Sequence, residues 1–230
     1  MKIHVLQHVS FEGPAYIQKW ANNNGHYLEI VRLFEGAPLP DINEISALMI
    51  MGGPMSVTEE DIYPWLKPEK DLSKAAVSKN LPVLGICLGA QMIAASWGAL
   101  IKKNPEKEIG WMDVKLSMAG QINPACAGLP ESFTAFHWHG ETFDLPNNAV
   151  RLAESEATHI QAFQLNRAIG LQFHLETTRE SMDLMLENCA ADLTPGPYVQ
   201  SRERILSIEE KAIEELNKHM DSILAYWIQA

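Results

Sequence analysis

Short apolar runs recur along the first ninety residues and alternate with longer segments rich in alanine, lysine and glutamate. The apolar runs are Ile3–Leu6, Leu28–Leu33, Ala47–Met51 and Pro82–Cys87. Each is bounded by glycine, proline or polar clusters, as buried strands are. Pro68–Lys79 and Ala90–Trp97 have the length and composition of helices. The alternation predicts an α/β fold of three layers, α/β/α, with a mostly parallel central sheet.

The pattern changes after residue 111, where short strand-like pieces are separated by brief turns. These pieces are Met112–Leu116, Phe133–Trp138, Val150–Ala153, Ile160–Gln164 and Ile169–His174. Strands joined by short turns pair in antiparallel fashion, so antiparallel additions to the sheet are expected. Thr177 and Glu180 have the spacing of a capping box and predict a helix from just after Glu176 to about Asn188.

The C-terminal part carries a further helical pattern. Thr194–Pro197 (TPGP) breaks the chain, and Ser207 with Glu210 can open the next helix. Apolar residues then recur at helical spacing on one face, which predicts packing against the main domain. These residues are Ala212, Ile213, Leu216, Met220, Ile223, Leu224 and Trp227. We therefore expect a main domain at 1–195 and a C-terminal helical extension at 196–230.

Composition narrows the class of function. The chain has 230 residues, 47% of them apolar, and a formal net charge of −11. This charge repels nucleic acid and anionic membrane surfaces, so a small-molecule substrate is expected. No apolar run approaches the roughly 18 residues of a membrane span, and the first residues have neither the long apolar region nor the cleavage site of a signal peptide, so export is not expected. Three cysteines without C-x-x-C spacing disfavour a disulfide framework, which fits a cytoplasmic protein.

The segment from Pro82 to Gln91 (PVLGICLGAQ) is the most informative, because a buried strand runs into a helix through G-x-C-x-G. This has the form of a nucleophile elbow. The turn presents Cys87 beside the helix N-terminus, which favours a thiolate, and the backbone N–H of Leu88 points where an oxyanion can form. The alternative is an inert buried cysteine in a tight turn.

Two other segments supply partners for Cys87. A glycine-rich turn follows the strand at Met49–Met51, and Gly53 can offer a second backbone donor there. His174 and Glu176 stand two apart on a predicted strand and so face the same side. Such a pair lets a carboxylate hold one imidazole nitrogen while the other reaches a nucleophile.

Taken together, G-x-C-x-G-x-Q, the upstream G-G-P-x-S and the downstream H-x-E resemble the class I (triad) glutamine amidotransferases, in particular a free-standing member like the glutaminase of GMP synthase. The resemblance covers roughly residues 1–190 and implies a flavodoxin-like fold. It makes Cys87 the nucleophile, His174 the general base and acid, and Glu176 its orienter.

The same resemblance implies further site residues. Gly53 and Leu88 supply the oxyanion hole, Gln91 contacts the substrate, and His139 with Gly140 matches a pocket-lining segment. Cys87 attacks the glutamine side-chain amide, ammonia leaves, and water hydrolyses the γ-glutamyl thioester, with neither cofactor nor metal. One departure is Leu175, where the family usually has proline.

The sequence leaves several alternatives open. Only 54 residues follow Glu176, too few for a synthetase domain, so the chain is either one subunit with a synthetase partner in trans or a free-standing hydrolase. A γ-glutamyl peptidase would use the same triad on larger amides. A cysteine chaperone–protease would carry His in place of Leu88. A non-catalytic regulatory subunit is the alternative from another class.

Three polar segments have competing interpretations. His137 and His139 alternate on a strand and can ligate zinc with help from Glu141, but pocket lining is the favoured interpretation. The segment 108–111 can close over a substrate, although its Trp111 equally suits the core. Residues 59–61 (EED) suit a solvated helix start.

Overall fold

A computed structural model of the protein describes residues 1–229. One nine-stranded sheet runs through it in the order β2-β1-β3-β4-β9-β8-β7-β5-β6. The strands are β1 (Lys2–Gln7), β2 (Tyr27–Arg32), β3 (Leu48–Ile50), β4 (Val83–Ile86), β5 (Ile101–Leu116), β6 (Ser132–Phe143), β7 (Val150–Glu154), β8 (Ala162–Leu165) and β9 (Ala168–Leu171). The first five in sheet order pair in parallel and the rest in antiparallel fashion. The mixture of parallel and antiparallel strands was predicted, but β9 was expected among the antiparallel additions and instead pairs in parallel with β4.

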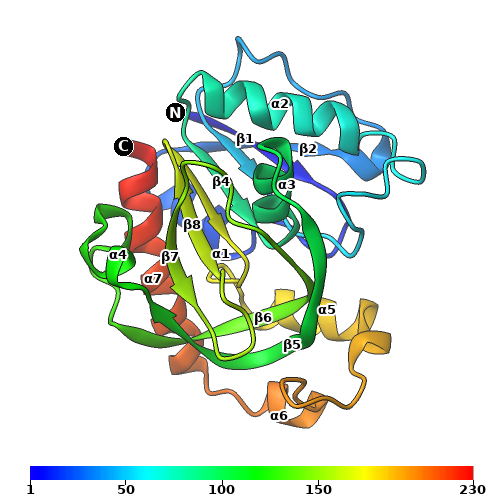
Figure 1. The fold of residues 1–230 in the computed structure, drawn as a ribbon, viewed down its shortest axis with the longest axis vertical. Helices are drawn as coiled ribbons and strands as arrows, with labels where there is room; N and C mark the ends of the chain where they lie inside the picture. Colours follow the sequence, from blue (N-terminus) through cyan, green and yellow to red (C-terminus); the bar gives the residue numbers. More distant parts are fainter. Residues whose placement is uncertain (230) are drawn as a thin grey trace.

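Helices cover both faces of the sheet (Figure 1). They are α1 (Tyr16–Asn23), α2 (Leu66–Ser78), α3 (Leu88–Ser96), α4 (Met118–Ile122), α5 (Arg179–Asn188), α6 (Arg202–Leu206) and α7 (Glu210–Gln229), with short 3₁₀ turns at Leu33–Glu35, Pro124–Cys126 and Ala190–Asp192. One apolar cluster joins the sheet to α1, α5 and α7, and a second joins it to α2 and α3. Side chains of β3 alternate between the clusters, with Met49 in the first and Leu48 and Ile50 in the second. The predicted three-layer fold is therefore confirmed.

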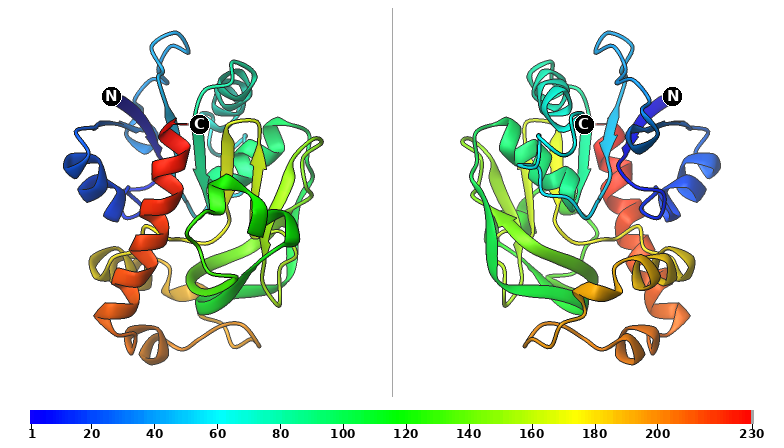
Figure 2. Two further views of the ribbon diagram at one scale, coloured as in Figure 1. Left: turned by 90° about the vertical axis from the view of Figure 1, so that its left-hand side faces the viewer. Right: turned by 90° about the vertical axis from the view of Figure 1, so that its right-hand side faces the viewer.

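The C-terminal helix α7 runs along one side of the molecule, as the two side views show (Figure 2). Its apolar stripe is buried from Ile213 to Trp227 as the spacing predicts, but Ala212 at its start is exposed. Asn217 on the same helix donates hydrogen bonds to the carbonyls of Leu175 and Thr177, both at 3.0 Å. Helix α7 therefore supports the segment that carries His174 and Glu176. The domain boundary at residue 195 stays a prediction.

Several expected boundaries were wrong, among them the start of the last helix, because Ser207 ends α6 and α7 begins at Glu210. The predicted strand at Ile169–His174 ends at Leu171. The capping box of α5 joins Thr178 to Ser181 rather than Thr177 to Glu180, because Thr177 is buried and the helix begins one residue later. Residues 59–61 lie in a turn before α2 rather than at its start, where the Glu59 carboxylate accepts a 2.8 Å hydrogen bond from the Ser56 N–H.

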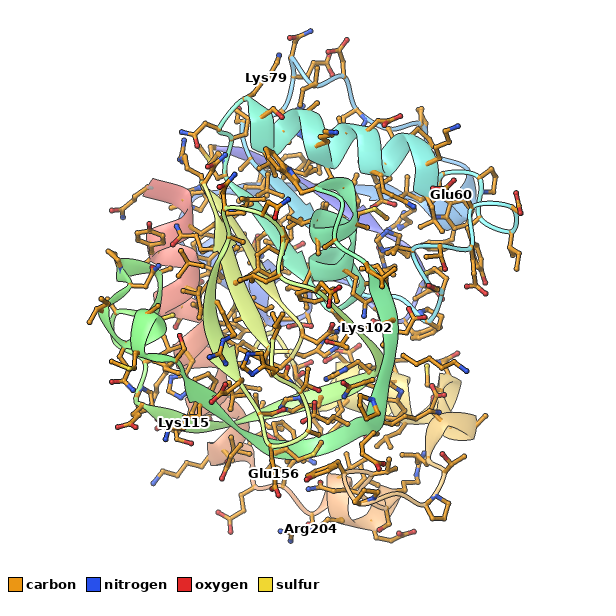
Figure 3. The ribbon with its side chains drawn as sticks, in the orientation of Figure 1. Glu60, Lys79, Lys102, Lys115, Glu156 and Arg204 are labelled. Carbon is orange, nitrogen blue, oxygen red and sulfur yellow. The ribbon has the colours of Figure 1, made fainter. Side chains whose placement is uncertain are left out.

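Charged residues lie mostly at the periphery, for example Lys79, Lys115 and Arg204 (Figure 3). Within residues 1–229, no helix has both the length and the apolar character needed to cross a membrane.

Candidate active site

Cys87 sits in a sharp turn between β4 and α3. Its backbone has φ 52° and ψ −106°, a conformation that L-residues rarely adopt. A Cβ on Gly85 would lie 2.4 Å from the Gly89 carbonyl, and one on Gly89 would lie 2.0 Å from the Ile50 oxygen. Strand and helix can approach this closely only because both positions are glycine. The two glycines thus set the elbow that the sequence predicts.

His174 and Glu176 follow β9 instead of lying on it, yet their side chains meet. The His174 Nδ1 and a Glu176 carboxylate oxygen are 2.7 Å apart, and both residues are buried. The His174 N–H donates to the Phe136 carbonyl on β6 at 2.8 Å. A single β-bridge to β6 therefore positions His174 where the strand has already ended.

The electrostatics around His174 favour its charged form. Burial alone would lower the pKa of the imidazole, but the Glu176 carboxylate and the Cys87 sulfur outweigh burial and raise the pKa well above its usual value. Within residues 1–229 the His174 Nε2 makes no hydrogen bond, so it is the ring nitrogen that remains available to Cys87. The arrangement can hold a thiolate–imidazolium pair.

Cys87 opens onto a cavity of about 610 Å³ at the carboxyl ends of the parallel strands. Gly53, Gln91, His139 and Gly140 also line this cavity. Leu88 begins α3 directly after Cys87, so its backbone N–H belongs to the helix turn that lacks intrahelical acceptors. Five of the predicted site residues thus line one cavity, while His174, Glu176 and Leu88 are not among the residues that line it.

Gln91 is tied to a residue that the sequence analysis missed. Its side-chain amide donates to the Gln172 side-chain oxygen at 3.2 Å, and the Gln172 amide lies 3.6 Å from the Cys87 sulfur. The Cys87 thiol in turn lies 3.6 Å from the Trp138 carbonyl. No local motif marks Gln172, since its partners are 81 and 85 residues away in the sequence.

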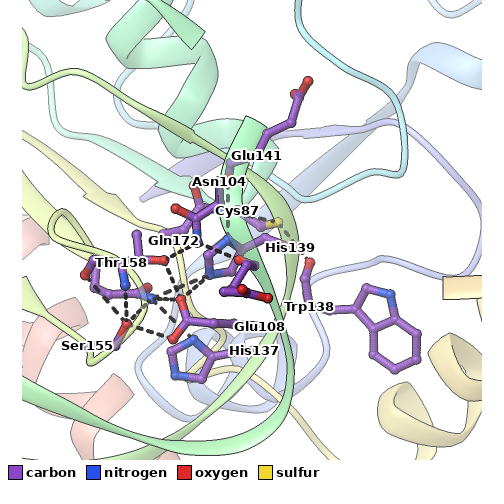
Figure 4. A network of polar contacts seen from close by, with 12 residues as sticks. Cys87, Asn104, Glu108, His137, Trp138, His139, Glu141, Ser155, Thr158 and Gln172 are labelled. Atoms are coloured by element: carbon purple, nitrogen blue, oxygen red, sulfur yellow. Dashed lines mark hydrogen bonds and ion pairs between the residues drawn. The ribbon is translucent and has the colours of Figure 1, made fainter. Parts of the chain in front are cut away.

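Glu108 holds His139 of β6 and lies next to His137 (Figure 4). Its carboxylate lies 3.1 Å from the His139 Nε2 and also accepts hydrogen bonds from the side chains of Ser155, Thr158 and Gln161. Burial would raise the pKa of Glu108, but the hydrogen bond from His139 and the charges of the two histidines lower it to about 2.

The same pair of histidines bears on the zinc alternative. Ligand atoms of Glu108, His137 and His139 lie within 4.8 Å of one another, so the third candidate ligand is Glu108 and not Glu141. Because four donors already occupy the Glu108 carboxylate, a hydrogen-bonded support for His139 accounts for the cluster. Glu108 is 1% exposed and does not cover the cavity, and Trp111 is a core residue.

Glu12 is a second residue that the sequence analysis missed. It lines the cavity, is 9% exposed and forms no side-chain hydrogen bond within the described part of the chain. A Cβ on Gly52 would lie 2.2 Å from the Glu12 carboxylate and 3.5 Å from the His174 ring, so both side chains border Gly52. Burial, opposed by the charges of His174 and His8, raises the pKa of Glu12 to about 7.

This pKa predicts how stability changes with pH. Between pH 4.5 and 7 the folded protein holds a proton on Glu12 that the unfolded chain has lost, so stability falls as pH rises. At ~1.4 kcal/mol per pKa unit, the loss in the free energy of unfolding reaches about 3 kcal/mol above pH 7.

The substitution Glu12→Gln should remove this pH-dependent loss of stability. Denaturant unfolding should find this variant equal to the parent below pH 4.5 and more stable at pH 8, while exposed Glu35→Gln shows no such divergence. Parallel curves for parent and E12Q would contradict the prediction.

The far wall of the cavity comes from two segments, 103–107 of β5 and 192–199. Lys107 on the first pairs with Asp192 on the second at 3.3 Å. The sequence predicted 194–197 only as a chain break, but Thr194, Pro195 and Gly196 line the cavity.

Comparison with known proteins agrees with this fold. Residues 16–193 match the family model described as glutamine amidotransferase class-I. The chain is 34% identical over 215 residues to the putative glutamine amidotransferase-like protein YfeJ of Salmonella typhimurium, covering 91% of this chain and 89% of that one. The chain belongs to the class I glutamine amidotransferase family.

Two other proteins add detail. The chain is 29% identical over 177 residues to a GMP synthase [glutamine-hydrolyzing] of Thermosipho africanus, covering 75% of this chain but only 32% of that protein. It therefore spans about a third of that enzyme's length. A solved glutamine amidotransferase from Methylobacillus flagellatus is 30% identical, with a TM-score of 0.92 over 99% of this chain and 94% of that one.

Proposed function

We propose that this protein is a glutaminase-type amide hydrolase in which Cys87 is the nucleophile, His174 the general acid and base, and Glu176 the orienter of His174. The observation that carries the proposal is that Cys87, in a strained elbow, opens onto a large cavity and interacts with His174, which Glu176 holds at 2.7 Å. Class I glutamine amidotransferases are in general cysteine-dependent amidohydrolases, which supports the same assignment.

The proposed reaction has two halves. The Cys87 thiolate attacks the carbonyl carbon of a γ-amide, and the oxyanion accepts hydrogen bonds from the N–H groups of Gly53 and Leu88. His174 then gives its proton to the departing amine, and a γ-glutamyl thioester remains. Water, deprotonated by His174, hydrolyses the thioester to glutamate. Both halves of the reaction use only side chains and backbone groups of the protein.

In the proposed site, Gln91, His139 and Gly140 bind the substrate. Gln91 and His139 are both fixed by hydrogen bonds, to Gln172 and Glu108 respectively, while Gly140 leaves room for the stem of Lys107. Rigid polar groups of this kind orient a small ligand at little cost in entropy.

A second candidate is hydrolysis of γ-glutamyl amides larger than glutamine. The cavity volume of about 610 Å³ lies within the ~300–1,000 Å³ range that accommodates drug-sized ligands. Segments 103–107 and 192–199, joined by the Lys107–Asp192 pair, add polar groups to the wall of this cavity besides the predicted site residues. A γ-glutamyl peptide would place its second residue there.

The partner is the remaining question of function. GMP synthases [glutamine-hydrolyzing] match this chain over about a third of their length, which favours a synthetase subunit in trans. YfeJ matches over 89% of its own length, which favours a free-standing hydrolase. We propose the free-standing form, acting without a partner.

A substrate panel tests these proposals. The isolated protein should release ammonia from glutamine, or the second amino acid from γ-glutamyl dipeptides, and it should leave α-glutamyl dipeptides intact. Ratios of kcat/KM decide between glutaminase and peptidase. If every γ-glutamyl substrate is inert alone, yet glutamine is hydrolysed after a synthetase is added, the free-standing form is wrong and the subunit form is right. If no substrate is hydrolysed in either case, the proposed hydrolase function fails.

A further inference from the structure

A buried histidine, His8, lies just beyond the end of β1, beside the glycine pair that follows β3. The two strands are parallel neighbours, and Leu6 is in register with Ile50. His8 and Gly52 therefore stand at the same level, two residues further on. The His8 Nδ1 lies 3.1 Å from the Gly52 carbonyl oxygen.

The other ring nitrogen of His8 meets Glu69 on α2. The His8 Nε2 and a Glu69 carboxylate oxygen are 2.9 Å apart, and both residues are fully buried. Each ring nitrogen thus faces an oxygen acceptor, so the ring donates two hydrogen bonds only when it is doubly protonated. Burial lowers the pKa of His8, but the charge of Glu69 outweighs burial and raises it. The ring is therefore fixed as a donor toward Gly52.

A fixed Gly52 carbonyl also fixes the N–H of Gly53, because the two groups belong to one peptide plane. No peptide bond in the described chain is cis, so this N–H points opposite to the carbonyl and away from His8. Gly53 lines the cavity that contains Cys87. Within residues 1–229 the Gly53 N–H has no acceptor.

The glycine pair cannot hold this orientation by itself. Glycine turns more freely than other residues. A Cβ would lie 2.2 Å from the Glu12 carboxylate at Gly52 and 2.6 Å from the Met55 sulfur at Gly53, so a bulkier residue at either position would have to displace one of these side chains. If the peptide turned over, a carbonyl oxygen would face the developing oxyanion in place of an N–H. A hydrogen-bond donor to the Gly52 carbonyl oxygen would prevent the peptide from turning over.

We infer that His8, held by Glu69, is a positioning residue that locks the Gly52–Gly53 peptide with its N–H toward the oxyanion formed on attack by Cys87. This rests on the proposed hydrolase function. The His8–Glu69 pair thereby contributes to the transition state without touching the substrate.

The test is His8→Gln, since a glutamine amide reaches the Nε2 position and Glu69 but leaves the Gly52 carbonyl without a donor. Losing one oxyanion donor typically costs ~10²–10³-fold in kcat. We expect kcat to fall by about this factor while KM changes less than about threefold. His8→Asn places an amide at the Nδ1 position instead, so it should recover most of the lost kcat.

Alkylation of Cys87 by iodoacetamide separates positioning from general damage. This displacement occurs at a saturated carbon and forms no oxyanion, so it depends only on the thiolate. Its rate, measured on the Cys87 peptide by mass spectrometry, should be the same in His8→Gln as in the parent. His4→Gln, on β1 just before His8 and 1% exposed, is the matched control and should leave kcat unchanged. Equal losses of alkylation and hydrolysis in His8→Gln would overturn the inference.

A crystal structure of His8→Gln tests the lock without any substrate. The Gly52–Gly53 peptide should be turned over or present in two orientations. An unchanged peptide with full kcat overturns the lock and leaves the hydrolase function standing. A turned peptide in a protein whose parent hydrolyses nothing supports the lock and overturns the function.

Discussion

Replacing Cys87 with alanine should lower hydrolysis of γ-glutamyl amides by at least about 10⁴-fold. The sulfur forms the covalent bond to the substrate, and neither Gln172 nor Trp138, which lie against it, can replace a nucleophile. The fold should survive, because only one buried atom is lost and the backbone strain at φ 52° is the same for alanine. Ammonia release under substrate saturation measures the first effect, and thermal unfolding measures the second.

Cys126→Ala is the matched control. Cys126 is also buried, and burial raises the pKa of its thiol to about 11, so it stays protonated at neutral pH. Cys189 lines the same cavity as Cys87, but its thiol pKa is raised to about 12, chiefly by burial. Both alanine variants should keep the parent's activity. Substantial turnover by Cys87→Ala would remove Cys87 from the mechanism.

The parallel half of the fold could be predicted because each of its strands is a compact apolar run between turn residues. The β5–β6 hairpin was predicted only in pieces, since β5 begins at Ile101 with a polar stretch that contains Pro105 and shifts register between Lys103 and Glu108. Long-range pairing, and not local pattern, makes that stretch a strand. Helix α1 was missed although Ile17, Trp20 and Ala21 have helical spacing and are buried.

The candidate site was predictable where chemistry and shape are local. The elbow needs Gly85, Cys87 and Gly89 within five residues, and these alone indicate the turn. His174 and Glu176 were predicted to share a side because of a strand that in fact ends at Leu171; a hydrogen bond to Phe136 does the positioning instead.

The supporting residues could not be predicted from sequence patterns. His8 meets Gly52 and Glu69, which are 44 and 61 residues away, and Glu12 reaches the site from the loop after β1. Such contacts depend on which strands become neighbours in the sheet. A strand order has to be known before these residues can be assigned to the site.

His174→Asn and Glu176→Gln should both lose activity, but to different extents. Without an imidazole no group can take the Cys87 proton and return one to the leaving amine, so His174→Asn should fall by about as much as Cys87→Ala. In Glu176→Gln the amide oxygen can still accept the hydrogen bond from Nδ1, so His174 keeps its orientation and loses only a neighbouring charge. The loss of activity in Glu176→Gln should therefore be roughly 10²-fold smaller than the loss in His174→Asn.

The lost charge should also move the pH profile. The Glu176 carboxylate helps to hold the pKa of His174 above its usual value, so Glu176→Gln lowers that pKa. The imidazolium, and with it the acid for the leaving amine, then disappears at a lower pH, and the alkaline limb of kcat/KM should shift toward acid. Glu180→Gln, a charge loss on the exposed first turn of α5, should shift nothing. A fully active Glu176→Gln with an unmoved alkaline limb would show that Glu176 does not orient or charge His174.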